Sequence, residues 1–192
     1  SLVGSEMCIR DSIYIIGSKG IPANYGGFET FVEQLTAGRQ SEEIVYHVAC
    51  MDEKAEVVRY NGAECFHLAV PSIGPAKAVY YDLKAIAWCL HDIRKNNIKD
   101  AVVYVLACRI GPFIGTWKKR LAACGAKLYV NPDGHEWKRA KWNYLIRKYW
   151  KFSEKLMVKH ADLLICDSKN IESYIRTVSY THLRAHETRR HL

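Results

Sequence analysis

The segment from residue 131 to residue 142 holds the densest mixture of side chains that could do chemistry in this sequence. Carboxylates beside a strand end can orient sugar hydroxyls or act as general acid and base, and arginine and lysine can hold phosphate. The same mixture also fits a polar loop that caps the next helix, and a lone histidine is as often a surface residue as a catalytic one. The side chains are Asp133, His135, Glu136, Trp137, Lys138, Arg139, Lys141 and Trp142.

A glycine-rich stretch between Ile16 and Phe28 is the second candidate. An apolar run ends at Ile16, and a helical pattern begins near Phe28. Glycine permits positive φ and a close backbone approach to a ligand, and the amides that open a helix favour an anion such as phosphate. The spacing is not G-x-G-x-x-G, so a dinucleotide site gains little support. A turn that needs glycine only for its geometry fits the pattern equally well. The glycines are Gly17, Gly20, Gly26 and Gly27.

Strand and helix patterns alternate through the middle of the chain, which predicts an α/β fold with a doubly wound, mostly parallel, Rossmann-like sheet. Ligands bind outside the carboxyl ends of the strands in such sheets. The loops at 17–27, 109–115 and 131–142 should therefore lie at one edge. The expected strands are 13–16, 44–50, 65–70, 101–107, 127–131 and 163–166, and the expected helices are 28–38, 77–97, 116–124, 143–160 and 168–174.

The helix expected at 143–160 separates into an apolar arc and a basic arc. It fits either a core helix with a solvated outer face or a basic surface that faces acidic lipid headgroups. Nucleic acid is the weaker alternative, because the aromatic residues lie on the apolar arc and not among the lysines. The apolar arc comprises Leu145, Ile146, Tyr149, Trp150, Phe152, Leu156 and Met157, and the basic arc comprises Arg147, Lys148, Lys151, Lys155 and Lys159.

Composition indicates one globular domain with an anionic partner. The 192 residues are 49% hydrophobic and 25% charged, and the formal net charge is +8. A basic balance favours nucleotide phosphate, acidic lipid or nucleic acid as partner. No apolar run approaches the ~18–20 residues of a membrane span. The seven scattered cysteines lack a C-x-x-C pair, which predicts buried free thiols in a reducing cytoplasm, and no ligand set demands a metal.

The two ends differ in composition and periodicity from the rest. Residues 1–12 and 178–192 resemble translated sequencing-adapter sequence, so we expect them to be disordered artefact. The expected domain is therefore 13–177. Three histidines near the C-terminus lack a cysteine or carboxylate framework, which argues against a metal site there.

Three motifs carry a resemblance to a known family. They are IIGSKGIP at residues 15–22, YGGFET at 25–30 and DGHEWKRAKW at 133–142. Together they resemble the N-terminal half of bacterial rhamnosyltransferase-type glycosyltransferases. These belong to the retaining GT-B group with two Rossmann domains, and they use nucleotide-sugars to build capsule or surface polysaccharide. The likeness spans about residues 13–177.

The resemblance implies that this half mainly holds the acceptor, a glycan or lipid-linked sugar, at the cytoplasmic face of the cell membrane. It implies that a nucleotide-sugar is the co-substrate, with no further cofactor, and that Gly20, Gly26 and Gly27 approach the donor diphosphate. The catalytic groups would be Asp133, His135 and Glu136. The acceptor or cleft residues would be Glu29, Arg109, Trp137, Lys138, Arg139 and Lys141.

The sequence departs from that family in one respect. The nucleotide-binding half and its E-x7-E motif are not in these 192 residues, so we expect a fragment that is inactive alone. Glu56 and Glu64 match the E-x7-E spacing, but they flank the wrong kind of segment and we treat the match as chance. Two other functions stay open. One is a non-catalytic module that binds anionic lipid or glycan, and the other is a Rossmann-type oxidoreductase or epimerase that uses Asp52 to bind a ribose.

Overall fold

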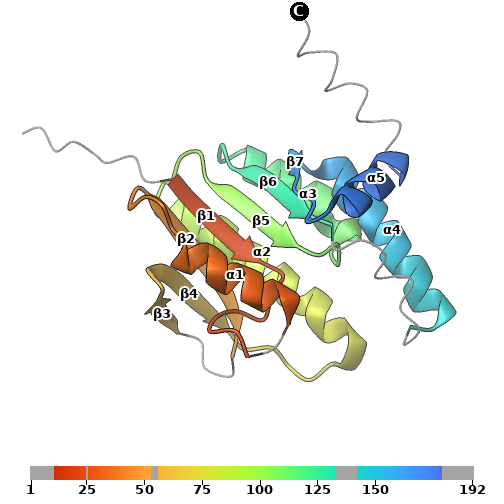
Figure 1. Cartoon of the computed structure of the whole chain (residues 1–192), viewed down its shortest axis with the longest axis horizontal. Coiled ribbons are helices and arrows are strands. Elements are labelled where there is room, and N and C mark those ends of the chain that lie inside the picture. The colour runs from red at the N-terminus through yellow and green to blue at the C-terminus, as the bar shows by residue number, and fades with distance from the viewer. Residues whose placement is uncertain (1–10, 25, 53–55, 133–141, 179–192) are drawn as a thin grey trace, which may run out of the picture.

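Seven strands form one sheet with helices against both of its faces in the part of the chain that the structure describes (Figure 1). The structure is a computed structural model, and it describes residues 11–24, 26–52, 56–132 and 142–178. The strand order is β3-β4-β2-β1-β5-β6-β7, and only the β3–β4 pair is antiparallel. The predicted α/β fold with a mostly parallel sheet is therefore confirmed.

The bounds of the elements follow the alternation expected from the sequence. The strands are β1 (Asp11–Ile16), β2 (Ile44–Met51), β3 (Val57–Tyr60), β4 (Ala63–Leu68), β5 (Val102–Leu106), β6 (Lys127–Asn131) and β7 (Leu163–Leu164). The helices are α1 (Gly27–Ala37), the short 3-10 helix η1 (Gly74–Ala76), α2 (Lys77–Lys95), α3 (Gly111–Ala122), α4 (Tyr144–His160) and α5 (Lys169–Val178).

The core lies on both sides of the sheet because successive strand side chains point to opposite faces. Ile15 of β1 packs with Val32 of α1 on one face, whereas Tyr14 packs with Ile86 of α2 and Ile114 of α3 on the other. In Figure 1, α1 lies in front of the sheet and α2 behind it. Because β4, β2, β1, β5, β6 and β7 run parallel, their carboxyl ends and the loops that follow them lie at one edge of the sheet.

Strand β3, which forms a hairpin with β4, is not among the expected strands, because the sequence around it is polar. Val57 of β3 pairs with Phe66 of β4, and Tyr60 pairs with Ala63. The turn consists of Asn61 and Gly62, which have φ of 49° and 73°. Two residues at positive φ match the twist of a tight hairpin, so these two residues fix the register of the pair.

Several element boundaries differ from the expected ones. Helix α3 begins at Gly111 and not at Thr116, because Pro112 is tolerated in a first helical turn. Strand β1 begins at Asp11, which pairs with Ile44, so the sheet starts two residues before the expected domain start. The last helix continues to Val178 and does not end at residue 174, and Ser168 Oγ caps its start by accepting a hydrogen bond from Ile171 N at 3.2 Å.

Helix α4 differs from its prediction in which side chains it buries. Trp150 and Met157 are buried as expected, but Leu145 and Phe152 are 74% and 55% exposed. The apolar arc of the sequence is therefore not wholly a core arc. Asn143 Oδ1 caps the helix by accepting from Ile146 N at 3.0 Å. None of the helices within the described ranges has the length and hydrophobicity needed to cross a bilayer.

The described cysteines are free thiols, in agreement with the sequence. Cys50, Cys65, Cys89 and Cys108 are buried. They serve as small apolar core residues, apart from Cys50, which also contacts the glycine loop.

Candidate functional site

The glycine loop follows β1 at the carboxyl edge of the sheet. Gly17, Gly20 and Gly26 have φ of 97°, 107° and 130°, as the sequence led us to expect. Gly27 is the first residue of α1 and does not have positive φ, so of the two properties that glycine permits, only the close backbone approach applies at that position. A Cβ on Gly17 would lie 2.0 Å from the carbonyl oxygen of Leu106. The loop therefore needs glycine at position 17 for both its conformation and its contact with β5.

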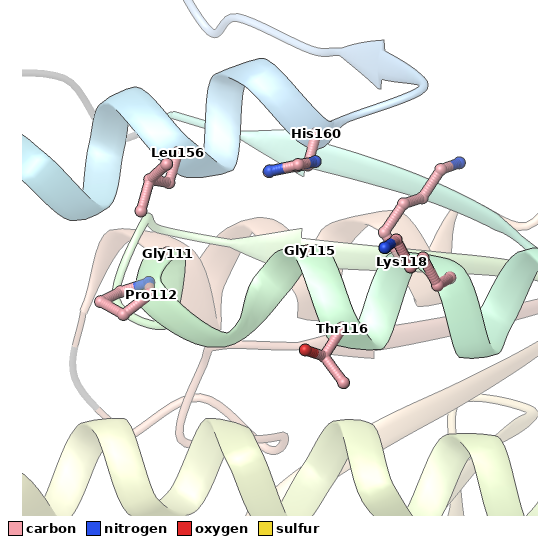
Figure 2. Close-up of a pocket in the computed structure, with 8 residues that line it drawn as sticks. Gly111, Pro112, Gly115, Thr116, Lys118, Leu156 and His160 are labelled. Carbon is pink, nitrogen blue, oxygen red and sulfur yellow. The ribbon is translucent and has the colours of Figure 1, made fainter.

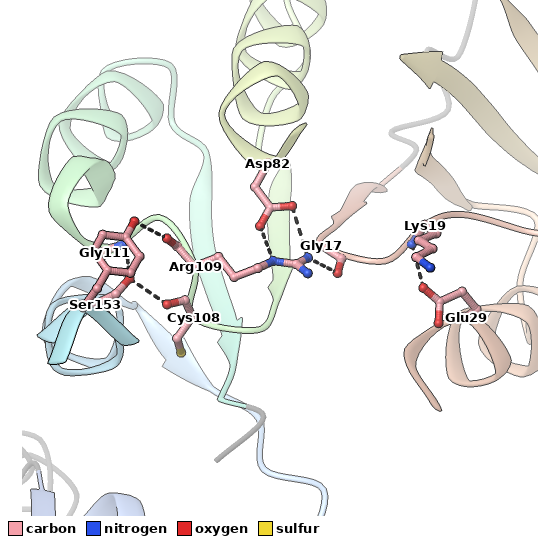
Figure 3. Close-up of polar contacts among 9 residues, drawn as sticks. Gly17, Lys19, Glu29, Asp82, Cys108, Arg109, Gly111 and Ser153 are labelled. Atoms are coloured by element: carbon pink, nitrogen blue, oxygen red, sulfur yellow. Dashed lines mark hydrogen bonds and ion pairs between the residues drawn. The ribbon is translucent and has the colours of Figure 1, made fainter. Parts of the chain in front are cut away.

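Three hydrogen bonds fix the path of this loop. The amide of Lys19 donates to Glu29 Oε1 at 2.7 Å, and the carbonyl of Lys19 accepts from the amide of Met51 at 2.9 Å. The guanidinium of Arg109 donates to the carbonyl of Gly17 (Figure 3). The loop is thus tied to α1, to the end of β2 and to the loop after β5.

Arg109 forms a two-bond ion pair with Asp82 of α2. Its Nε lies 2.7 Å from Asp82 Oδ2, and its Nη2 lies 3.2 Å from Oδ1. Asp82 is fully buried. Burial raises the pKa of Asp82, and the Arg109 guanidinium opposes that rise. Arg109 therefore lies at the predicted edge, where its described bonds hold the glycine loop in place.

Helix α4 holds the backbone on either side of Arg109. Tyr149 donates its hydroxyl to the carbonyl of Arg109 at 2.8 Å. Ser153 Oγ donates to the carbonyl of Cys108 at 2.6 Å and accepts from the amide of Gly111 at 2.7 Å (Figure 3). Together with the bond from Arg109 to Gly17, these bonds join α4 and the loops after β1 and β5 into one hydrogen-bonded unit.

Two buried polar atoms at this edge have no hydrogen-bond partner among the described residues. Ser18 Oγ lies in the glycine loop, and Asn131 Oδ1 lies at the end of β6. The Nδ2 of Asn131 donates to Asp167 Oδ1 at 2.7 Å and to the Tyr104 hydroxyl at 3.3 Å, so only its oxygen is left over. A buried polar atom without a partner is costly, which makes both atoms candidates for contacts with a polar ligand.

The start of α1 is open at Gly27, whereas the Glu29 carboxylate lies beside Gly26. Its N-cap is Gly26, which supplies no side-chain hydrogen bond, and Gly27 is exposed. A Cβ on Gly27 would have no atom within 4 Å. The first amides of a helix favour an anion, so the geometry permits a phosphate to approach here.

A pocket of about 610 Å³ lies beside the loop, at the carboxyl ends of β2 and β4. Its polar side chains are Asp52, Ser72 and Lys77, and its apolar side chains are Met51, Ala69, Val70 and Pro71. Asp52 Oδ2 lies 3.3 Å from His67 Nδ1. Polar atoms facing an apolar wall suit a sugar, which has hydroxyl edges and a carbon–hydrogen face.

A second pocket, of about 300 Å³, lies between α3 and α4 (Figure 2). His160 of α4 faces Gly115 of α3, and a Cβ on Gly115 would be 3.3 Å from its Nε2. Lys118 is paired with Asp162. The residues that line it come from α3 and α4, and we assign this pocket no ligand.

Most of the residues predicted to be catalytic or cleft-forming lie outside the described residues. These are Asp133, His135, Glu136, Trp137, Lys138, Arg139 and Lys141. The segment that contains them connects Asn131, at the carboxyl end of β6, to Trp142. Within the ranges that are described, no cluster of three or more His, Cys, Asp or Glu side chains could hold a metal ion.

Four residues of this edge were not predicted from the sequence: Asp82, Ser153, Ser18 and Asn131. For Asp82 a signal existed, because it lies three residues before Ala85 and seven before Cys89, on the buried face of α2. A carboxylate at a buried helical position requires a partner. Arg109 is the cation that satisfies this requirement.

Replacing Asp82 with asparagine should lower the free energy of unfolding by about 1–3 kcal/mol, because a largely buried guanidinium loses its counter-charge. Chemical denaturation would measure the change. The double variant D82N/R109M should recover part of the loss, because no unpaired charge remains. If D82N had the same free energy of unfolding as the wild type, the ion pair between Asp82 and Arg109 would not stabilise the fold.

Comparisons with known proteins give a structural match and a family. No curated protein matches the sequence. Among solved structures, one described as trehalose-6-phosphate from E. coli bound with UDP-2-fluoro glucose matches with a TM-score of 0.46 and 10% identity. The match covers 86% of this chain and 41% of that one, so this chain spans less than half of that protein's length. Residues 10–189 match the family described as a domain of unknown function, DUF1972, and the chain belongs to that family.

Proposed function

We propose that this chain is the acceptor-side half of a retaining glycosyltransferase that transfers a sugar from a nucleotide-sugar to a glycan or lipid-linked acceptor. The observation that carries the proposal is the glycine loop. The loop has three glycines at positive φ and leads into α1, which begins at the exposed Gly27 without a side-chain cap. It lies at the carboxyl edge of a mostly parallel sheet. The resemblance of the loop and of residues 133–142 to rhamnosyltransferase motifs supports the same reaction and makes rhamnose the first sugar to test.

In this proposal, each part of the edge has a separate task. The donor diphosphate approaches the backbone at Gly20, Gly26 and Gly27, where helix amides stabilise its charge. The pocket beside Asp52 and Lys77 takes the acceptor sugar. The expected catalytic groups are Asp133, His135 and Glu136, with Trp137, Lys138, Arg139 and Lys141 as acceptor contacts. Glu29 and Arg109, which were expected to be cleft residues, hold the loop in position.

The chemistry needs little beyond orientation and charge stabilisation. The bond from the sugar's anomeric carbon to the diphosphate oxygen breaks as an acceptor hydroxyl forms a new bond on the same face. The hydroxyl proton passes to the departing phosphate oxygen, so charge is balanced. A positioned loop would contribute by holding the two substrates together and by stabilising the leaving diphosphate.

The proposal is tested by incubating the protein of the complete open reading frame with a panel of radiolabelled nucleotide-sugars. Lipid-linked and free glycans serve as acceptors, and label in the glycan is measured. Transfer with at least one pair is expected. Binding of a glycan without transfer to any acceptor would instead favour a non-catalytic module.

A nicotinamide-dependent reaction is the remaining alternative, because Asp52 follows β2 at the position where an acidic residue would bind a ribose. The glycine spacing does not support it. The same protein should therefore show no change in NAD(P)H absorbance with nucleotide-sugars as substrates. A nucleotide-sugar-dependent absorbance change would contradict the transferase assignment.

A further inference from the structure

The outer face of α4 combines exposed apolar side chains with cations. Leu145 and Phe152 are 74% and 55% exposed, and Tyr144 is 67% exposed. Residues seven apart lie on the same side of a helix, two turns apart, so Leu145 and Phe152 form one ridge. Three large apolar side chains on one short stretch of surface need an explanation, because a solvated helix face would carry polar residues there.

Five basic residues lie on this same exposed face. Lys148 Nζ lies 4.6 Å from the centre of the Tyr144 ring, so positive charge and apolar surface are directly adjacent. The one acidic residue of α4, Glu154, is buried and accepts a hydrogen bond from the Tyr174 hydroxyl at 2.6 Å. The exposed basic residues are Arg147, Lys148, Lys151, Lys155 and Lys159.

The position of α4 in the fold makes this face accessible. The helix begins after β6, on the side of the sheet where the strands end, and its first turns reach outward past the strands (Figure 1). Its inner face is fixed by Ser153 and Met157, which are fully buried against the rest of the domain. The exposed ridge of Leu145 and Phe152 therefore belongs to a helix whose opposite face is packed in the core.

We propose that α4 docks this domain on an anionic lipid bilayer. Tyr144, Leu145 and Phe152 enter the boundary between headgroups and acyl chains, while the cations of the helix contact acidic headgroups. The choice of a bilayer rests on charge complementarity: a face with five cations, three apolar side chains and no exposed carboxylate of its own matches an anionic, apolar-cored surface. The attachment is interfacial, and it does not depend on the proposed sugar transfer.

The first experiment measures co-sedimentation of the 192-residue chain with vesicles of phosphatidylcholine containing phosphatidylserine, and with phosphatidylcholine alone. Binding is expected only to the anionic vesicles, and it should weaken as salt is raised. The variant K148E/K155E should bind on the order of 100-fold more weakly, since two attractive charges become repulsive. The matched control is K95E/K99E, which changes net charge equally at exposed lysines at the opposite end of the sheet.

The second experiment tests the apolar part separately. The variant L145Q/F152Q should bind anionic vesicles at least about tenfold more weakly, because less apolar surface is buried, while keeping its fold and charge. V57Q/V58Q, which changes two exposed residues of β3, is the control. Circular dichroism and thermal midpoints verify that each variant is folded.

Three outcomes would overturn the proposal. The first is that the wild type ignores anionic vesicles even at low salt. The second is that K95E/K99E reduces binding as much as K148E/K155E does. The third is that sedimentation velocity reveals a dimer that is lost in L145Q/F152Q while vesicles remain unbound, which would assign the face to a second copy of the chain.

Discussion

Replacing Gly17 with alanine is expected to lower the free energy of unfolding by about 3–5 kcal/mol. Two costs add: alanine is strained at a φ of 97°, and its Cβ would lie 2.0 Å from the carbonyl oxygen of Leu106. The obstructing atom belongs to the backbone of β5 in the centre of the sheet, so it cannot move aside cheaply. The thermal midpoint should fall by roughly 10 °C or more.

Gly125 provides a matched control for this variant. It also has positive φ, of 77°, but a Cβ there would meet no atom within 4 Å. G125A should therefore cost only the conformational strain, on the order of 1–2 kcal/mol. Equal effects of G17A and G125A in chemical denaturation would show that the close approach of the glycine loop to β5 is absent.

The sheet could be predicted because its signals are local. Strand β6 was placed at 127–131 from its apolar pattern alone, and α2 was placed within two residues of its end. The β3–β4 hairpin was missed because β3 is an edge strand whose Val57 and Val58 are exposed, and the residues next to them in the sequence are polar. The pair Asn61-Gly62 was the available signal, because asparagine followed by glycine favours a tight hairpin turn.

The parts of the site that were not predicted depend on contacts between distant segments. Nothing local in the sequence of α2 indicates that Asp82 reaches Arg109, which is 27 residues away, or that this arginine then reaches the Gly17 carbonyl. The exposure of Leu145 and Phe152 likewise depends on how far α4 extends beyond the sheet. Hydrophobic periodicity gives the faces of a helix but not the length over which a neighbour covers them.

The loop contains two kinds of glycine. Gly17, Gly20 and Gly26 are required by their conformation, so variants at those positions test the fold. Gly27 is exposed, lies in a helix and has free space around its Cα. We therefore expect a larger side chain there to leave the fold intact and to obstruct only a ligand.

The most direct test of the account is therefore sugar transfer by G27V in the complete enzyme, with G27A as an intermediate step in size. Transfer by G27V should fall by about 100-fold or more, because the valine side chain keeps the diphosphate away from the helix amides. The transfer rate of G27A should lie between those of G27V and the wild type. The free energies of unfolding of all three proteins, compared by their thermal midpoints, should agree to within about 1 kcal/mol. Transfer by G27V within about threefold of wild type would contradict the proposal that a ligand approaches this loop.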